Sequence, residues 1–238
     1  MEITAFRDHP LFATLSPAQL ERLLPCAREL AFPDDALILR EGDPADTLYA
    51  LRAGCVALDS RGHGALRHLL HGSVALDVLK QTDRLLLVSG PNLEPPPARR
   101  GAYRIVVMND GSSAAEAVLR ALAALLPAEG VELTLLRVHL RAPETQDDVA
   151  ALESCRRELE EARALLPASL TVQALVREIP RGGGVDTAVV ETALELGAHA
   201  IALSTHGQTA SRHVIIGSMG TTMLGRSQLP LLLARSDV

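Results

Sequence analysis

The sequence of 238 residues has no tryptophan, and aromatic residues make up only 2% of it. Its core must therefore be aliphatic, and a nucleic acid would find few aromatic faces on which to stack its bases. Positive charge is also scarce, because the formal net charge is −6 at pH 7. That is the wrong sign for binding a phosphate backbone, so we expect no nucleic acid partner.

Long apolar runs are missing as well. No uninterrupted run approaches the roughly 18 residues of a membrane span, and the start MEITAFRDHP lacks the basic and apolar regions of a signal peptide. We therefore expect a cytoplasmic protein with no membrane association. Cys26, Cys55 and Cys155 are odd in number and show no CxxC spacing, which predicts neither a disulfide framework nor a zinc site.

The sequence does contain a regular α/β pattern in residues 102–238. Nearly continuous apolar runs, typical of buried parallel strands, alternate with segments whose apolar residues recur every three to four positions. This predicts a doubly wound five-stranded parallel sheet covered by helices on both faces. The expected strands are 103–109, 131–140, 170–179, 199–204 and 229–235, and the expected helices are 112–126, 149–166, 185–197 and 217–227. A Pro-rich linker at 93–101 separates this domain from residues 1–92.

An internal repeat connects the two parts of the chain. Residues 55–88 align without gaps on residues 200–233, with every position shifted by 145. The alignment superposes Gly62 on Gly207, Gly72 on Gly217, and Ser73 on Ser218. Two copies of one strand-loop-helix-strand unit are therefore expected. A whole domain counted back from the first copy would start roughly 45 residues before residue 1, so we expect a truncated or replaced first copy.

The loop STHGQTASRHVIIGS, residues 204–218, has features of a phosphate-binding turn. Gly207 and Gly217 would let the backbone approach a ligand closely, and the helix that follows offers unpaired N–H groups to an anion. Asp110, at the end of the first strand of this domain, could accept hydrogen bonds from a ribose or a base. The same residues are also typical of an ordinary helix cap and an ordinary turn, and spacing alone does not decide between the two interpretations.

Residues 103–235 resemble a universal stress protein domain, an adenine-nucleotide α-hydrolase-like fold. In that family the first strand ends in an Asp-Gly-Ser turn, and the ATP-binding members carry G-x2-G-x9-G-S/T. The resemblance implies a stress-response or signalling module that binds ATP or a related adenine nucleotide, with or without Mg²⁺. It implies at most slow ATP hydrolysis. Asp110 would contact the adenosine part, Val138 would lie near the adenine, and Gly217 and Ser218 would hold phosphates. The implied site residues are Asp110, Gly111, Ser112, Val138, Ser204, Thr205, His206, Gly207, Gly217 and Ser218.

One position departs from the family pattern. Ser204 stands where nucleotide-binding members have the first glycine, and Asp59 stands there in the first copy. If that glycine is needed for a positive φ, or for close approach of the backbone to the nucleotide, we expect serine to weaken nucleotide binding. A carboxylate at Asp59 would repel phosphates. The alternative function is therefore a dimerisation or protein-interaction module of the same fold that does not bind nucleotide.

Residues 10–58 allow two interpretations. They are similar to the N-terminal half of a cyclic nucleotide-binding domain, with an amphipathic helix after Ser16. However, the glycine, glutamate and arginine residues with which that family binds the cyclic phosphate have no counterpart here. Alternatively, residues 36–62 are the third strand, a shortened helix and the fourth strand of a truncated universal stress protein domain. We favour this tandem arrangement, because the repeated unit needs partners on both faces of its sheet.

Two apolar strands are expected to pair. Residues 85–90 and 230–235 are equivalent under the repeat, and two open apolar edges would invite aggregation. We therefore expect self-association through these strands, either within one chain or across a dimer.

Overall fold

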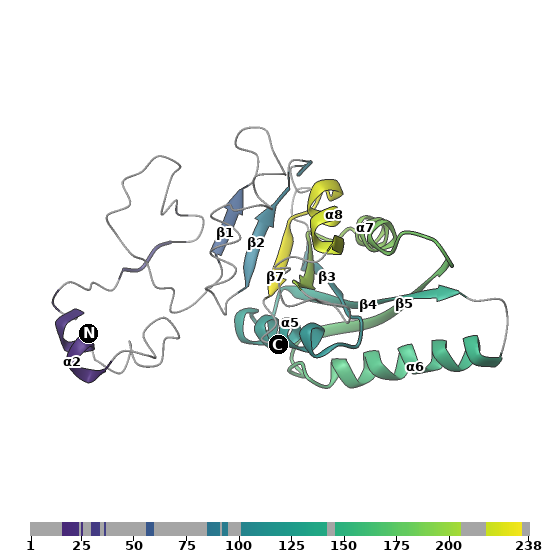
Figure 1. Ribbon diagram of the computed structural model, residues 1–238, viewed down its shortest axis with the longest axis horizontal. Helices are drawn as coiled ribbons and strands as arrows, with labels where there is room; N and C mark the ends of the chain where they lie inside the picture. Colours follow the sequence, from purple (N-terminus) through teal and green to yellow (C-terminus); the bar gives the residue numbers. More distant parts are fainter. Residues whose placement is uncertain are drawn as a thin grey trace. The chain divides into compact units, whose positions relative to one another are not determined.

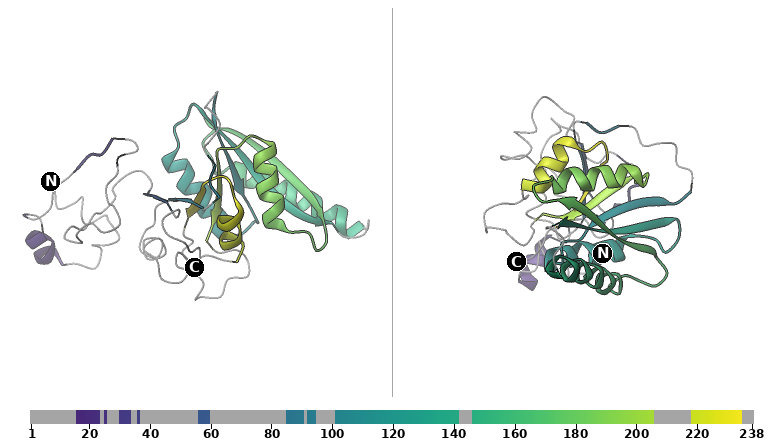
Figure 2. Two further views of the ribbon diagram at one scale, coloured as in Figure 1. Left: turned by 90° about the horizontal axis from the view of Figure 1, so that it is seen from above. Right: turned by 90° about the vertical axis from the view of Figure 1, so that its right-hand side faces the viewer.

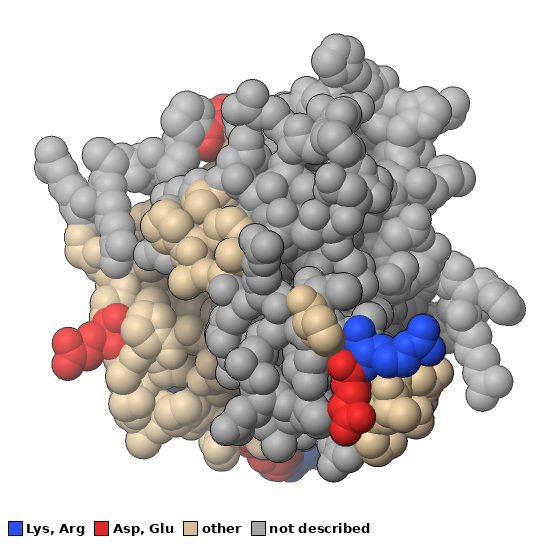
Figure 3. Space-filling model, turned by 90° about the vertical axis from the view of Figure 1, so that its left-hand side faces the viewer, with Lys and Arg blue, Asp and Glu red and all other residues tan. Residues whose placement is uncertain are grey.

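The computed structural model describes residues 16–23, 25, 30–33, 36, 56–59, 85–90, 92–94, 101–141, 146–205 and 218–234 (Figure 1). The chain forms two compact units, residues 1–53 and residues 54–238. On the face shown in Figure 3, the described residues carry scattered acidic side chains and few basic ones. None of the described helices is long and apolar enough to cross a membrane.

The described part of the first unit contains helix α2 (Pro17–Leu23). Ser16 and Gln19 form a reciprocal cap at its start: the backbone N–H of Ser16 donates to Gln19 Oε1 at 2.8 Å, and Gln19 N–H donates to Ser16 Oγ at 3.4 Å. Pro17 suits the first helical position because the N–H it lacks would have no helical partner there. The expected helix after Ser16 is confirmed, while most of what would separate the two interpretations of residues 10–58 lies outside the described residues.

A single sheet organises the second unit. The described strands follow the order β1-β2-β7-β6-β3-β4-β5, and all neighbours are parallel except β2 and β7. The predicted five-stranded parallel sheet is confirmed as β7-β6-β3-β4-β5, and β2 and β1 extend it. The strands are β1 (Val56–Asp59), β2 (Leu86–Ser89), β3 (Tyr103–Met108), β4 (Val131–Arg141), β5 (Thr171–Pro180), β6 (Ala200–Ser204) and β7 (Leu231–Ala234).

Helices cover both faces of this sheet, as predicted (Figure 2). Successive strand residues point to opposite faces, so Ile105 and Val107 enter one core and Val106 enters the other. The first core packs against α5 (Ser113–Leu125) and α6 (Gln146–Arg163), and the second against α7 (Val185–Glu195) and α8 (Ser218–Arg226). The fully buried residues of both cores are aliphatic, apart from Met223.

The expected pairing of the two apolar strands is confirmed within one chain. Leu86 and Val88 of β2 lie opposite Leu233 and Leu231 of β7 in antiparallel register. The prediction left open whether this contact is made within one chain or across a dimer, and here the chain closes the edge of β7 with its own strand. The pairing also explains why β2 belongs to the same compact unit as residues 102–238.

Candidate functional site

The predicted site residues that the structure describes gather at one edge of the sheet. Met108 of β3 lies beside Leu136 of β4, and Val107 lies beside Ala202 of β6. Because the three strands are parallel, their carboxyl ends meet at the same edge. In open α/β sheets this is the edge where ligands bind. The predicted residues found there are Asp110, Gly111, Ser112, Val138, Ser204 and Thr205.

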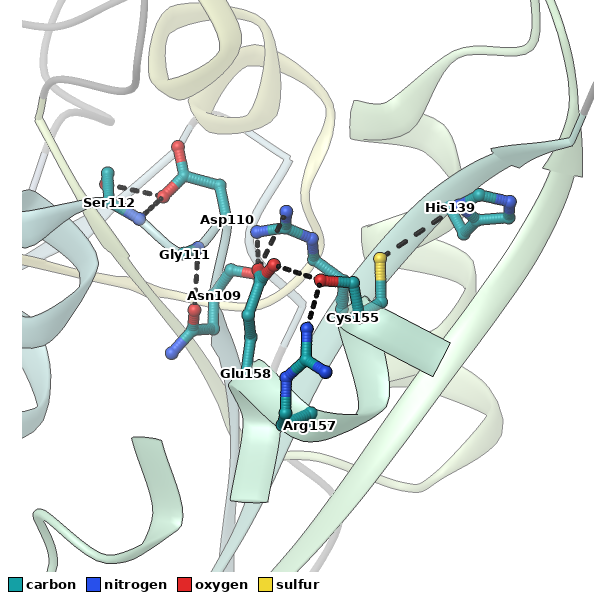
Figure 4. Close-up of polar contacts among 10 residues, drawn as sticks. Asn109, Asp110, Gly111, Ser112, His139, Cys155, Arg157 and Glu158 are labelled. Carbon is teal, nitrogen blue, oxygen red and sulfur yellow. Dashed lines mark hydrogen bonds and ion pairs between the residues drawn. The ribbon is translucent and has the colours of Figure 1, made fainter. Parts of the chain in front are cut away.

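The turn from β3 into α5 is held by its own side chains (Figure 4). Asn109 is buried, and its Oδ1 accepts the N–H of Gly111 at 2.8 Å. Oδ1 of Asp110 accepts both the N–H of Ser112, at 3.0 Å, and its hydroxyl. The hydroxyl of Ser112 in turn accepts the N–H of Ala115 at 3.2 Å and caps α5. These bonds fix the carboxylate of Asp110, which is half-buried.

Three of the backbone donors at this turn are already used within it. The N–H groups of Gly111, Ser112 and Ala115 all donate to side chains of the turn. An anion approaching here would also meet the negative charge of Asp110. The turn therefore suits the hydroxyl groups of a ligand, which can donate to a carboxylate, better than its phosphates.

Gly111 is favoured by its conformation, and a side chain there would displace two neighbouring side chains. Its φ is +75°, a region that residues with a Cβ rarely adopt. A Cβ at this position would lie 2.7 Å from Oε2 of Glu158 and 3.0 Å from Nη1 of Arg137. These two side chains form an ion pair at 3.2 Å, and Arg137 also donates to the carbonyl of Asn109 at 3.4 Å. Glycine thus lets the turn fit beneath the ion pair.

The end of β6 contributes Ser204 and Thr205. Ser204 is half-buried and paired with Ala234, so its backbone is extended and its φ is negative, as in any strand. A positive φ is therefore not needed at this position, and the only concern left about serine is its side chain. Thr205 is 1% exposed, and its N–H donates to the carbonyl of Ala234 at 3.0 Å.

The start of α8 and the end of β4 lie over the same core. Val138 and Met219 both pack against the core beneath α7 and α8. Ser218 is the first residue of α8, and its side chain is not described. The predicted site residues His206, Gly207 and Gly217 fall outside the described residues.

A second polar cluster lies under α6 and belongs to another part of the sheet. His139 is buried, with Nε2 3.0 Å from Oδ1 of Asp148 and Nδ1 4.0 Å from the sulfur of Cys155. Cys155 is buried and free. The described residues contain no group of three or more His, Cys, Asp or Glu side chains suited to a metal ion.

Sequence reasoning missed Asn109, Arg137 and Glu158. Asn109 could have been found, because asparagine before Asp-Gly commonly bonds to the backbone two residues ahead. Arg137 and Glu158 had no sequence signal, since they meet Gly111 only through the register of β4 and the position of α6.

The domain belongs to the class of doubly wound α/β domains, and the fixed carboxylate of Asp110 lies at the edge of the sheet where such folds bind their ligands. The model of the universal stress protein family matches residues 102–235, more than half of the chain. The chain belongs to this family, and the predicted membership is confirmed.

Solved structures agree on the fold. A universal stress protein from Archaeoglobus fulgidus DSM 4304 is 21% identical, with a TM-score of 0.52 over 76% of this chain and 60% of its own. A putative universal stress protein from Pseudomonas aeruginosa UCBPP-PA14 is 18% identical, with a TM-score of 0.52 over 76% of this chain and 63% of its own. This chain thus spans about three fifths of the length of these two proteins.

A further universal stress protein from Archaeoglobus fulgidus, solved in complex with dAMP, is 20% identical, with a TM-score of 0.41 over 57% of this chain and 99% of its own. No curated protein is significantly similar to the sequence.

Proposed function

We propose that residues 102–238 bind ATP or a related adenine nucleotide, as a stress-response or signalling module in the cytoplasm. The observation that carries this proposal is the carboxylate of Asp110, fixed by Ser112 at the carboxyl edge of the sheet. Membership of the universal stress protein family supports the same assignment. The nucleotide would lie across the ends of β3, β4 and β6.

The fixed turn gives the ligand an orientation. Asp110 would accept hydrogen bonds from the ribose hydroxyls, because a carboxylate accepts from hydroxyl groups and repels a phosphate. Val138 would lie beside the adenine. The phosphates would lie toward the start of α8, where Ser218 and the loop from His206 to Gly217 are expected to hold them, since a helix N-terminus stabilises an anion.

The position of Ser204 is compatible with this arrangement. Its extended backbone shows that glycine is not needed here for a positive φ. The other reason for glycine is space for the ligand, which the half-buried side chain of Ser204 reduces. Mg²⁺ would enter with the phosphates, because proteins usually bind this ion through substrate phosphates and one or two carboxylates. Any ATP hydrolysis would be slow, and phosphate release from the same samples measures it.

We also propose that residues 1–92 contain a truncated first universal stress protein unit, joined by the linker 93–101 to the complete unit 102–238. The strand register supports this organisation. Val56 of β1 pairs with Leu86, and Ile201 of β6 pairs with Leu231, each shifted by the 145 residues of the sequence repeat. The fold matches over 76% of the chain also extend beyond residues 102–235.

The test is equilibrium binding of a fluorescent ATP analogue to the full chain, with Asp110→Asn as the site variant. Asparagine keeps the acceptor that holds Ser112 but removes the charge. A hydrogen bond to a charged group is worth about 1.5–3 kcal/mol, so affinity should fall about 10- to 150-fold.

The matched control is Glu116→Gln in the first turn of α5, where the carboxylate pairs with Arg120 at 2.7 Å. It should leave affinity unchanged, and an equal loss in the two variants would contradict a contact with Asp110. Wild-type protein that shows no saturable binding up to about millimolar nucleotide would refute the proposal and favour the dimerisation or protein-interaction module.

A further inference from the structure

The polar cluster under α6 joins a thiol, an imidazole and a carboxylate. Nε2 of His139 lies 3.0 Å from Oδ1 of Asp148. Nδ1 of the same ring lies 4.0 Å from the sulfur of Cys155, which points toward it (Figure 4). A nucleophile, a base beside it and a third group that orients the base are the parts of an activated nucleophile. The cluster is separate from the proposed nucleotide site, because Val138 points to the opposite face of the sheet from His139.

The hydrogen bond to Asp148 decides which nitrogen of His139 carries the proton. An ionised carboxylate only accepts hydrogen bonds, so Nε2 donates to it. In the neutral ring Nδ1 then has no proton, and Nδ1 is the nitrogen that faces Cys155. The thiol can therefore pass its proton to Nδ1. The imidazolium that forms lies between a carboxylate and a thiolate, both of which accept its hydrogen bonds.

Cys155 lies on the buried face of α6. Leu159 and Ala162 follow it at helical spacing, and both pack in the first core. One turn nearer the start of the helix, the same face meets the imidazole of His139. A structural cysteine among apolar side chains is inert, whereas a thiol beside a base can form the reactive thiolate. The position of Cys155 is thus that of a reactive thiol.

The cluster lies close to the surface. β3 ends at Met108, opposite Leu136, and His139 lies on the part of β4 that continues beyond this point beside β5. Cys155 is 8% exposed and the side chain of Asp148 is 14% exposed. Such a narrow opening suits a small uncharged reagent and excludes a protein partner.

We propose that Cys155 is a peroxide-reactive thiol, with His139 as its base and Asp148 as the positioning residue of that base. The substrate class is hydrogen peroxide or another small hydroperoxide. Nδ1 takes the thiol proton, and the thiolate attacks one oxygen of hydrogen peroxide. The S–O bond forms as the O–O bond breaks, and the proton on Nδ1 passes to the leaving hydroxide. The sulfur is oxidised by two electrons to a sulfenic acid, and the peroxide is reduced to water.

The test measures oxidation of Cys155 in the folded full chain. Cys26 and Cys55 are replaced by alanine, so that Cys155 is the only thiol. The protein is treated with hydrogen peroxide in the presence of dimedone, which traps sulfenic acid, and the dimedone adduct should appear on Cys155 by mass spectrometry. If folded protein gives no adduct at a peroxide concentration that oxidises free cysteine, the proposal is wrong.

Two substitutions test the roles of His139 and Asp148. His139→Gln keeps a polar side chain but removes the base, and Asp148→Asn keeps an acceptor for Nε2 but removes the charge. The oxidation rate should fall at least about 10-fold in His139→Gln, because a positioned base contributes about 10²-fold or more. It should fall about 3- to 10-fold in Asp148→Asn, because a charge-assisted hydrogen bond is roughly twice as strong as a neutral one.

The matched control is Asp147→Asn, an exposed position in the same helical turn, which should leave the rate unchanged. An equal rate in His139→Gln and in the parent chain would overturn the proposal. Loss of structure cannot imitate the expected result, because a loosened α6 would expose Cys155 and raise its oxidation rate. A fall in the rate therefore indicates lost proton transfer.

A measurement without these substitutions covers the case in which the variants fail to fold. The oxidation rate of the chain with Cys155 as its only thiol is followed in urea below the unfolding transition. A thiol that reacts in the folded state should keep its rate over this range. If the rate rises in proportion to the unfolded fraction, Cys155 reacts only when the protein opens, and the proposal is refuted.

Discussion

Replacement of Gly111 by alanine tests how the site turn is built. Alanine at φ +75° carries the cost of the left-handed region, about 1–2 kcal/mol. The new Cβ would also lie 2.7 Å from Oε2 of Glu158 and displace its ion pair with Arg137, which is worth up to about 1 kcal/mol for a pair that is partly exposed. The total is about 1–3 kcal/mol, or roughly 2–10 °C in the melting temperature of a unit of this size.

Gly182→Ala is the matched control for this experiment. Gly182 has a φ of +90°, and no atom lies within 4 Å of the position that a Cβ would take there, so alanine carries the backbone cost without the crowding. The effect of alanine on the unfolded chain is common to both variants and cancels in the comparison. Circular dichroism at 222 nm can follow thermal and urea unfolding, since the chain has no tryptophan to serve as a fluorescent probe.

The two contributions can be separated. Gly111→Ala should lose more stability than Gly182→Ala, and the excess should shrink by about 0.5–1 kcal/mol when Glu158→Ala is added, because the crowding atom is then gone. Equal losses in the two glycine variants would refute the crowding argument. An unchanged stability in Gly111→Ala would refute the backbone argument as well.

Three further predictions concern the side chains around the site. Ser112→Ala should cost about 0.5–2 kcal/mol in urea unfolding through loss of the α5 cap, and a neutral result would contradict that role. Asp148→Ala should lower the free energy of unfolding by about 1–3 kcal/mol, because it removes the carboxylate that pairs with the buried His139. The control Asp147→Ala, at an exposed position in the same helical turn, should change that free energy by less than about 1 kcal/mol. Equal losses in the two variants would contradict the pairing. Ser204→Gly should tighten nucleotide binding up to about 10-fold by freeing space, and a weaker affinity would show that the hydroxyl contributes to binding.

Much of the fold follows from hydrophobic pattern alone. The central strands of residues 102–238 are buried on both faces and therefore appear as continuous apolar runs, although the edge strand β5 is largely exposed. The helices bury one face and show apolar residues every three to four positions. The expected elements lie within a few residues of those in the structure, as at β3 (Tyr103–Met108) and α7 (Val185–Glu195). The internal repeat was equally accessible, because it requires only a comparison of residues at a fixed separation.

The candidate site was predictable to a smaller extent. The Asp-Gly-Ser turn and the end of β6 were found at the edge where the pattern placed them. The hydrogen bonds within the turn could not be predicted from the sequence, and they decide that Asp110 is fixed and that three nearby N–H groups are already used. The extended backbone of Ser204 likewise follows from its pairing with Ala234, a contact between separate strands.

The sequence by itself determined the α/β class, the order of the elements along the chain, the repeat and the family, because these depend on local periodicity and on residue identity. Only the tertiary structure decided which strands became neighbours. It brought Arg137 and Glu158 over Gly111, and it gave β7 a partner from the same chain. Strand pairing and helix packing join residues that are far apart in sequence. The local pattern that predicts each element therefore does not determine which other element lies beside it.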